Sequence, residues 1–337
     1  MQPDPSATLD DTGHALLRLA LSARELGYRF VTPTPATHRR VNSRPGHEWA
    51  SDLRGALGWS RPFRAGLLPA EIFTLMQRAG ILSEVDGGWQ SRLRLSSLDD
   101  QLYWHSAYPT TGADAVFFGP DTYRFVGAIQ RHLHDRQAPV SRAFDIGCGT
   151  GAGALNIALA RPAAQVWAGD INTSALRLAR VNAAIAGAGN VAACQSDMLC
   201  GAEGVFDLVV ANPPYLNDAM QRAYRHGGGS HGQELAVAML AAALPRLAPG
   251  GTMLLYTGAA FVEGCDTFLQ AAGRVLDDTP GTWQWRYREL DPDVFGEELD
   301  NPAYHDTERI AAVLLQVDAP HGPGPVYDGR GAAGPLA

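Results

Sequence analysis

The sequence predicts an α/β protein in which an open, mainly parallel sheet follows a smaller α+β domain. From about residue 140, strand-like segments alternate with helical ones, the pattern of sheets whose strands are joined by helices. A glycine-rich turn at 147–151 comes directly after the first of these strands. In the first 115 residues, helical segments instead precede a hairpin. With 46% apolar and 18% charged residues, the 337-residue chain can bury cores for two such domains.

The N-terminal domain is expected over residues 12–115, after a loose leader at 1–11. Apolar side chains at helical spacing predict its helices. They fall over 12–28, 49–57 and 69–79. Two strand-like segments then flank the turn Asp86-Gly87-Gly88, which predicts a hairpin over 81–95. Helices followed by a hairpin indicate a winged-helix-like domain. Since such domains bind nucleic acid, dock proteins or act as lids, the architecture leaves its role open.

The second domain is expected over 116–318. Its strands are expected near 141–146, 165–170, 191–195, 206–211, 251–257, 282–289 and 310–317. Its helices are expected near 151–160, 173–187, 233–247 and 261–273. The last two strands flank the loop 290–308 and would form an antiparallel edge. The tail at 319–337 is rich in Gly and Pro, which predicts disorder.

The composition argues against several classes of protein. No apolar run approaches the ~20 residues that a membrane helix needs, and the acidic N-terminus lacks the apolar core of a secretory signal. The four cysteines show neither a CxxC pair nor a disulfide framework, which indicates a reducing cytoplasm. No His/Cys cluster has the spacing of zinc ligands, so no metal is expected.

The charge is uneven along the chain, and every basic residue is Arg. Residues 1–140 hold 15 Arg against 14 Asp and Glu, whereas the rest hold 12 against 21. A surface that binds phosphates should raise the local charge well above neutral. Contact with RNA would therefore have to rest on a basic patch in the N-terminal domain. Its arginines are Arg39, Arg40, Arg44, Arg54, Arg61 and Arg64.

The turn that starts at Asp145 has the form of a site for a nucleotide-like cofactor. Gly147, Gly149 and Gly151 allow the backbone to turn tightly and a ligand to approach it closely. The helix that begins there offers free N–H groups. The pattern DxGxGxG differs from the GxGxxG of dinucleotide-binding proteins.

Acidic residues follow the next two strands. Asp170 ends the second strand, where a carboxylate can accept both hydroxyls of a ribose. Asp197 follows the third and can accept from an adenine amine, with Met198 or Leu199 packing against the ring. Because strand ends converge at the crevice where open α/β sheets bind ligands, these acids should surround the turn. Each acid alone could be a helix cap; the three acids together favour a cofactor pocket.

The turn Asn212-Pro213-Pro214-Tyr215 follows the fourth strand and is predicted to hold a planar nitrogen. The carbonyl of the Asn212 side chain and that of the Pro213 backbone can accept both N–H bonds, which favours a tetrahedral nitrogen as positive charge develops. Tyr215 offers an aromatic face to a flat base or amide. Asn-Pro also begins many ordinary turns that have no catalytic role. Beside the cofactor turn it indicates methyl transfer from S-adenosylmethionine to nitrogen.

In these motifs the chain resembles the class I S-adenosylmethionine-dependent methyltransferases. Within them it resembles the NPPY group, which includes HemK-type protein-glutamine methyltransferases and rRNA or DNA amino methyltransferases. The resemblance covers about 116–317 and runs through 145–151, Asp170-Ile171-Asn172, Asp197 and 212–215.

The resemblance implies a seven-stranded Rossmann-like sheet in the order 3-2-1-4-5-7-6. It implies S-adenosyl-L-methionine as cofactor, with S-adenosyl-L-homocysteine as product. The implied catalytic residues are Asn212, Pro213 and Tyr215. The implied cofactor contacts are Asp145, Gly147, Gly149, Gly151, Asp170, Ile171, Asp197, Met198, Asn212 and Thr122.

Thr122 comes from a further match. HemK enzymes carry a Pro-Arg-Pro-Glu-Thr-Glu loop over the cofactor, and the similar segment here runs from Phe118 to Arg124. Pro120 and Thr122 match the loop, whereas its arginine and final glutamate have no counterpart. The N-terminal domain is closer to the accessory domains of rRNA guanine methyltransferases than to the all-helical domain of HemK.

The acceptor stays open at this stage. It could be a macromolecule, either an RNA base, as on the ribosome, or a protein glutamine. A small metabolite or peptide is an alternative, as is a cofactor-binding protein without turnover. The motifs do not predict the oligomeric state.

Overall fold

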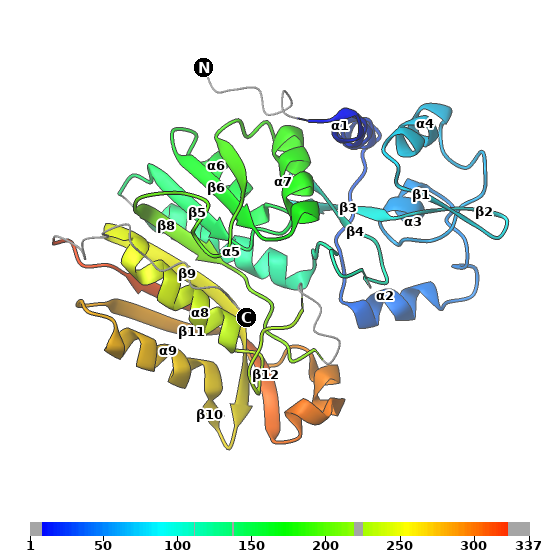
Figure 1. Ribbon diagram of the computed structural model, residues 1–337. Coiled ribbons are helices and arrows are strands. Elements are labelled where there is room, and N and C mark those ends of the chain that lie inside the picture. The colour runs from blue at the N-terminus through cyan, green and yellow to red at the C-terminus, as the bar shows by residue number, and fades with distance from the viewer. Residues whose placement is uncertain (1–8, 111, 137, 219–224, 323–337) are drawn as a thin grey trace, which may run out of the picture.

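A computed structural model describes residues 9–110, 112–136, 138–218 and 225–322 of the chain. Figure 1 shows two parts, a smaller N-terminal one in blue and cyan and a larger one built around a sheet. Most of the expected leader and of the expected disordered tail lies outside the described residues. The sheet with helices on both sides confirms the predicted α/β class.

The N-terminal part begins with helices whose starts are set by polar caps. They are α1 (Asp11–Glu25), α2 (Pro35–Asn42), α3 (Leu53–Leu57) and α4 (Ala70–Arg78). The side-chain oxygens of Asp10, Thr34 and Asp52 each accept from the N–H three residues on, at 2.6, 3.2 and 2.6 Å. The helix α2 escaped prediction because His38 is its only buried side chain, so it has no apolar periodicity.

Two hairpins follow these helices. The predicted one pairs β1 (Leu82–Val85) with β2 (Gly88–Ser91). The second pairs β3 (Leu93–Leu98) with β4 (Gln101–Ser106), and its turn holds Asp99 at a φ of 51°. Sequence reasoning missed it because Asp-Asp in place of Asn-Gly or Asp-Gly is a weak hairpin signal.

The core of the N-terminal part is shared with helix α7 (Thr173–Ala186). Ala175, Leu178, Val181 and Ile185 of this helix pack in the same buried cluster as α1 and α4. The fully buried Asn182 accepts from the Trp104 N–H at 2.8 Å and donates to the Trp104 carbonyl at 3.2 Å. The two parts are therefore joined by apolar packing and by a buried hydrogen-bonded amide.

The larger part is built on an eight-stranded sheet, one strand more than the expected seven. Its strands are β5 (Arg142–Ile146), β6 (Gln165–Asp170), β7 (Val191–Gln195), β8 (Phe206–Ala211), β9 (Leu247–Val262), β10 (Cys265–Asp266), β11 (Gln284–Asp291) and β12 (Thr307–Asp318). Neighbouring strands follow the path β11-β12-β9-β8-β5-β6-β7, and the two-residue β10 pairs with β9. Strands β7, β6, β5, β8 and β9 are parallel to one another, β12 pairs antiparallel with β9, and β11 pairs antiparallel with β12.

Helices cover both faces of this sheet (Figure 1). One face packs against α5 (Pro120–Asp135), α6 (Ala152–Ala160) and α7, the other against α8 (Glu234–Ala243) and α9 (Thr267–Asp278). The 3₁₀ helices are η2 (Leu244–Arg246), η3 (Gly296–Asp300) and η4 (Pro302–Tyr304). The helix expected over 261–273 begins later, at Thr267, because β9 continues to Val262 and turns back into β10.

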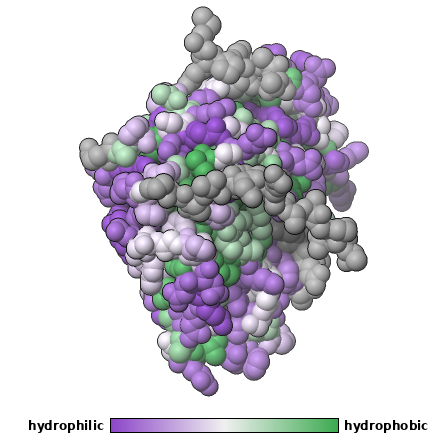
Figure 2. Space-filling model, turned by 60° about the vertical axis from the view of Figure 1, so that its left-hand side comes forward, coloured by the Kyte–Doolittle hydropathy of each residue, from purple (hydrophilic) through white to green (hydrophobic). Residues whose placement is uncertain are grey.

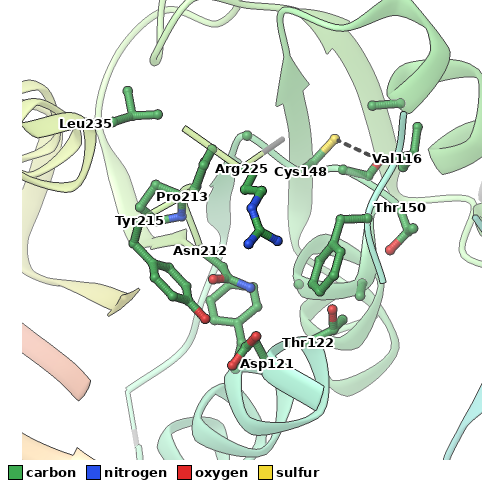
Figure 3. A pocket seen from close by; sticks show the side chains of 18 of the residues that line it. Val116, Asp121, Thr122, Cys148, Thr150, Asn212, Pro213, Tyr215, Arg225 and Leu235 are labelled. Carbon is green, nitrogen blue, oxygen red and sulfur yellow. Dashed lines mark hydrogen bonds between the residues drawn. The ribbon is translucent and has the colours of Figure 1, made fainter. Parts of the chain in front are cut away.

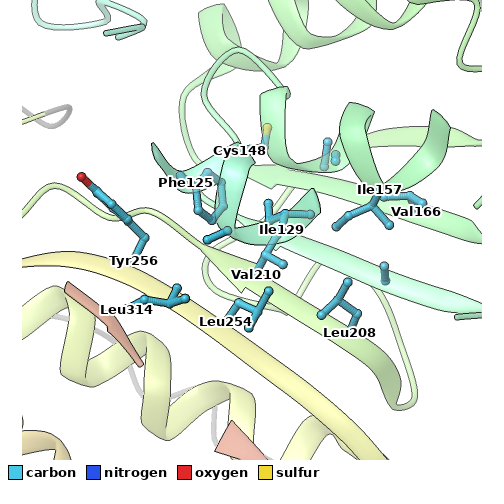
Figure 4. Packing of buried hydrophobic residues seen from close by; sticks show 14 of the residues in the cluster. Phe125, Ile129, Cys148, Ile157, Val166, Leu208, Val210, Leu254, Tyr256 and Leu314 are labelled. Carbon is cyan, nitrogen blue, oxygen red and sulfur yellow. The ribbon is translucent and has the colours of Figure 1, made fainter. Parts of the chain in front are cut away.

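Strand β8 shows why the central strands are mainly apolar on both faces. Leu208 and Val210 join the cluster on the α5 and α6 face (Figure 4), whereas Val209 and Ala211 join the one under α8 and α9. A strand that is buried on both faces is apolar along most of its length; the exception in β8 is Asp207, near its start, which accepts from the Ser141 and Arg142 N–H groups. The carboxyl ends of these strands are then the places where polar residues gather.

Candidate active site

A cavity of about 420 Å³ lies at the carboxyl ends of β5, β6, β7 and β8 (Figure 3). Its volume is in the range of pockets that hold small ligands. The wall contains nearly all the residues singled out in the sequence. They are Thr122, Asp145, Gly147, Gly149, Asp170, Ile171, Asp197, Met198, Asn212, Pro213 and Tyr215.

Gly151 is the predicted contact that does not line the cavity. It has a φ of 79°, and a Cβ placed there would lie 2.9 Å from Leu155 and 3.2 Å from Ala179. The residue therefore has to be glycine because α6 starts in a left-handed conformation and packs closely on α7. Gly149, at a φ of 54°, has open space where its Cβ would be, and so faces the cavity.

Asp170 holds the glycine turn against the end of β6. Its Oδ2 accepts from the Gly149 N–H and its Oδ1 from the Asn172 N–H, both at 2.9 Å. Burial raises the pKa of this carboxyl, and the two N–H groups oppose that shift. Each oxygen has a second lone pair, so two hydroxyls of a ligand could still be accepted. The neighbouring Ile171 is 61% exposed, a bare apolar surface on the cavity wall.

Asp145 lies beneath the first turn of α6. It is 1% exposed, and its Oδ2 accepts from the Ala154 N–H at 2.9 Å. Burial raises its pKa to about 7, and the nearby Asp170 adds to the shift. The carboxyl thus supports the turn from below, since its hydrogen bond goes to the helix.

Asp197 and Met198 come from a turn that Ser196 stabilises. The Ser196 hydroxyl donates to the Met198 carbonyl at 2.8 Å and accepts from the Gly201 N–H at 2.9 Å. Met198 has a φ of 50°, and Asp197 is exposed. The turn therefore presents a carboxylate and a thioether to the same side of the cavity as Ile171.

Asn212, Pro213 and Tyr215 form the opposite wall after β8. The Asn212 side chain lies in the cavity with the Arg225 guanidinium near it (Figure 3). Tyr215 is 7% exposed, and its ring packs edge-on against Phe295 at 5.7 Å between centroids. The ring is thus mostly a buried wall, and only a small part of it can face an acceptor.

Sequence reasoning missed a buried carboxyl beside this turn. Asp121, 2% exposed at the start of α5, accepts from the Tyr256 hydroxyl at 2.7 Å. The Tyr215 hydroxyl points toward it (Figure 3) and has no hydrogen-bond partner among the described residues. Burial raises the pKa of Asp121, whereas the Tyr256 hydrogen bond lowers it. Asp121 directly precedes Thr122, so the matching loop segment could have drawn attention to it.

Thr122 itself completes the start of α5. Its hydroxyl accepts from the Gly119 N–H at 3.2 Å, and the side chain is 6% exposed. Thr122 lines the cavity, but its hydroxyl is already engaged in the cap of α5.

The loop 224–232 follows the Asn212–Tyr215 turn, where a lid over the acceptor is expected from the sequence; its first residue, Tyr224, lies outside the described residues. Its next residue, Arg225, forms an ion pair with Glu298 of η3 and lies 3.7 Å from an oxygen of Asp218. Gly227 must be glycine, because a Cβ there would lie 1.9 Å from the Gly232 carbonyl oxygen. The loop is therefore tied to η3 across the cavity rim; its lid role stays a prediction.

No helix within the described ranges is long and apolar enough to cross a membrane, and the face in Figure 2 mixes hydrophilic and apolar side chains. Among the same residues, no group of three or more His, Cys, Asp or Glu side chains has the arrangement of a metal site.

The donor set fits a nucleoside-type cofactor. The cavity offers glycine backbone, carboxylates at the ends of two adjacent strands, and apolar surface between them on Ile171 and Met198. Opposite these, the wall from Asn212 offers carbonyl acceptors. A flat ring with a ribose and a second, amide-bearing ligand could thus meet in one enclosed space.

Comparison with known proteins agrees with this arrangement. Residues 128–260 match the family described as "Methyltransferase small domain". A release factor glutamine methyltransferase of Deinococcus radiodurans is 33% identical over 218 residues, which cover 62% of this chain and 73% of that protein. A ribosomal protein uL3 glutamine methyltransferase of Bordetella pertussis is 37% identical over 131 residues, 35% of this chain and 44% of that one.

Solved structures resemble the chain more distantly. Trm5b from Pyrococcus abyssi aligns with a TM-score of 0.48 and 15% identity, over 74% of this chain and 68% of that one. TYW2 of M. jannaschii in complex with AdoMet aligns with a TM-score of 0.46 and 11% identity, over 67% and 85%.

Proposed function

The chain belongs to the HemK-like class I methyltransferases, and we propose that it transfers a methyl group from S-adenosyl-L-methionine to the side-chain amide nitrogen of a protein glutamine. The observation that carries this proposal is the shared cavity. Asn212 and Pro213 lie on the wall opposite the glycine turn and Asp170. The glutamine methyltransferases among its relatives support the choice of an amide over other nitrogens.

The residues at the ends of β5, β6 and β7 bind the cofactor. Asp170 accepts the ribose hydroxyls with the lone pairs that Gly149 and Asn172 leave free. Ile171 and Met198 pack against the adenine ring, and Asp197 accepts from its amine. Asp145 holds the turn in place from beneath α6 and, as part of the cavity wall, also contacts the cofactor. When bound, the cofactor supplies a methyl group on a positively charged sulfur.

On the acceptor side, the chain holds the amide. The carbonyls of Asn212 and Pro213 accept its two N–H bonds, so the nitrogen lone pair turns toward the methyl group and positive charge on the nitrogen is stabilised. Holding both reactants in line accounts for most of the acceleration, so no strong base is needed. The sulfur keeps the electron pair of the broken S–CH3 bond and leaves as S-adenosyl-L-homocysteine, and the methylated nitrogen gives up one proton to water. Tyr215 forms the wall beside the amide, and its hydroxyl points away from the amide toward the buried Asp121 (Figure 3).

A labelling experiment tests the proposal. The full chain is incubated with methyl-labelled cofactor and cell extract, and the products are treated with RNase or with protease. Label that protease releases, followed by a methyl group on glutamine in mass spectra, is the expected result. A release factor and ribosomal protein uL3 are the first purified acceptors to try. Label that only RNase releases, or label in the small-molecule fraction alone, would overturn the proposal.

An RNA base is the second candidate acceptor, favoured by one surface. The N-cap of α2, Thr34, lines the cavity, and Arg39, Arg40 and Arg44 are exposed beyond it without an ion pair to any described carboxylate. Phosphate contacts through these arginines would make binding fall steeply with salt. RNA binding that is absent or insensitive to salt excludes this candidate.

The remaining expectations about organisation are also proposals. A winged-helix-like domain over 12–115 is supported by helices that precede a hairpin, and a methyltransferase domain over 116–318 by the sheet. The core shared with α7 implies that the first domain depends on the second for stability. A cytoplasmic location fits the four cysteines, all of which are free.

A further inference from the structure

A second, smaller cavity lies beside the first. It has a volume of about 30 Å³ and shares Pro35, Phe117 and Pro120 with the wall of the large cavity. His38 of α2 and Arg94 of β3 line it from the N-terminal part. It therefore lies where the N-terminal part meets the wall of the large cavity, at the start of α5.

Arg94 is a buried cation for which the described part of the chain provides no ion-pair partner. Arg94 is 5% exposed, and its Nε has no hydrogen-bond partner among the described residues. No described carboxylate forms an ion pair with it. Burial lowers the pKa of this guanidinium to about 10, so it stays charged at neutral pH.

His38 cannot supply the missing charge. Arg94 Nη1 lies 3.2 Å from its Nδ1, and because a guanidinium only donates, this nitrogen must accept. The other nitrogen, Nε2, then carries the proton and donates to the Trp59 carbonyl at 2.8 Å. Burial lowers the pKa of His38 to about 4, so the ring is neutral. Tyr108 covers it, with 4.1 Å between ring centroids.

A buried charge is strongly unfavourable unless an opposite charge and hydrogen bonds compensate it. The cavity that Arg94 lines has room for about two waters, since one water needs roughly 10–15 Å³ of such volume. A carboxylate has this size and matches the planar fork of a guanidinium, whereas a phosphate with its four oxygens is larger.

We propose that this cavity binds a carboxylate of the protein acceptor, which Arg94 pairs with while the neighbouring glutamine amide lies against Asn212. The assignment rests on the proposed function for the identity of the acceptor. The binding of a carboxylate to Arg94 can be tested without it. Arg94 would then determine which glutamines are methylated, through an acidic group close to the target amide.

Thermal unfolding of the full chain tests the binding step. Sodium acetate is titrated against neutral acetamide of similar shape, with sodium chloride to match the ionic strength. We expect acetate to raise the melting temperature in a saturable way and acetamide not to. In Arg94→Met the acetate effect should vanish, whereas Arg92→Met, which changes an exposed arginine just before β3, should retain it.

Two capped dipeptides distinguish the sources of the carboxylate. One carries a glutamate side chain and an amidated C-terminus; the other has a free C-terminus and no acidic side chain. The one that reproduces the acetate effect identifies the group. Failure of both would overturn the assignment to a protein acceptor.

The wild type alone can refute the site: equal responses to acetate and acetamide would do so even if Arg94→Met did not fold. With a protein acceptor in hand, Arg94→Met should raise KM about tenfold or more, the effect of losing a charged hydrogen bond, with little change in kcat. If Arg94→Met methylates the protein acceptor with an unchanged KM, the carboxylate site is wrong, whereas the proposed function still holds. An acetate response without methylation of any protein would support the carboxylate site and contradict the proposed function.

Discussion

Replacement of Asp145 by Asn should make the stability of the protein less dependent on pH. The carboxyl is 1% exposed, and burial raises its pKa from the usual 3.8 to about 7. The folded state therefore holds a proton that the unfolded state releases between these values. By linkage, the stability that this group contributes is present below pH 4 and is lost as the pH rises through 7.

The size of the effect follows from the shift. One pKa unit corresponds to about 1.4 kcal/mol, so about two units between pH 5 and 7 amount to roughly 3 kcal/mol. At pH 5 the neutral carboxyl and the amide that replaces it in Asp145→Asn are similar in shape, and both keep an oxygen for the Ala154 N–H. We therefore expect the stability of the variant relative to the wild type to rise by roughly 3 kcal/mol between pH 5 and pH 8.

Urea unfolding at pH 5 and pH 8, followed by circular dichroism, measures this difference. The pH dependence is the informative quantity, because an unpaired amide N–H₂ could lower the stability of the variant by about 1–3 kcal/mol at every pH. If the stability difference between wild type and Asp145→Asn does not change between pH 5 and pH 8, the carboxyl is not protonated by burial and the reasoning is wrong.

Three further variants test the assigned roles. Asn212→Ala should lower turnover by a factor of roughly 10²–10³, while isothermal titration shows an unchanged cofactor affinity. Asp170→Ala should instead weaken cofactor binding. Equal effects of the two variants on turnover and on cofactor affinity would contradict the assigned roles. Gly258→Ala places a Cβ 2.3 Å from the Tyr215 ring, so turnover and stability should both fall, by about 1–3 kcal/mol for the latter. The matched control Gly127→Ala, in α5 with open space at its Cβ, should keep turnover and gain up to about 1 kcal/mol of stability. A normal Gly258→Ala enzyme would show that the Tyr215 position does not matter.

The sequence alone predicted the sheet domain because its signals are local. Strands buried on both faces appear as short, mainly apolar segments, such as 206–211 with its run Leu208–Ala211, and the turn at 147–151 is marked by its glycines. Asp170 and Asp197 could be assigned to one site because parallel strands end at one edge of a sheet. The same logic brought Asn212 to the cavity. These predictions needed no knowledge of contacts between distant side chains.

Only the tertiary structure decided the partners of the buried polar groups. Asp145 faces α6 and Asp121 meets Tyr256. Arg94, which looks like any surface arginine in the sequence, is a buried cation on a cavity wall. The reason is physical: hydropathy and periodicity report how often a residue type is buried, whereas charge compensation depends on atoms brought together from elements far apart in the chain. Local pattern thus specified the strands and turns, and packing alone specified which of their polar side chains face a ligand.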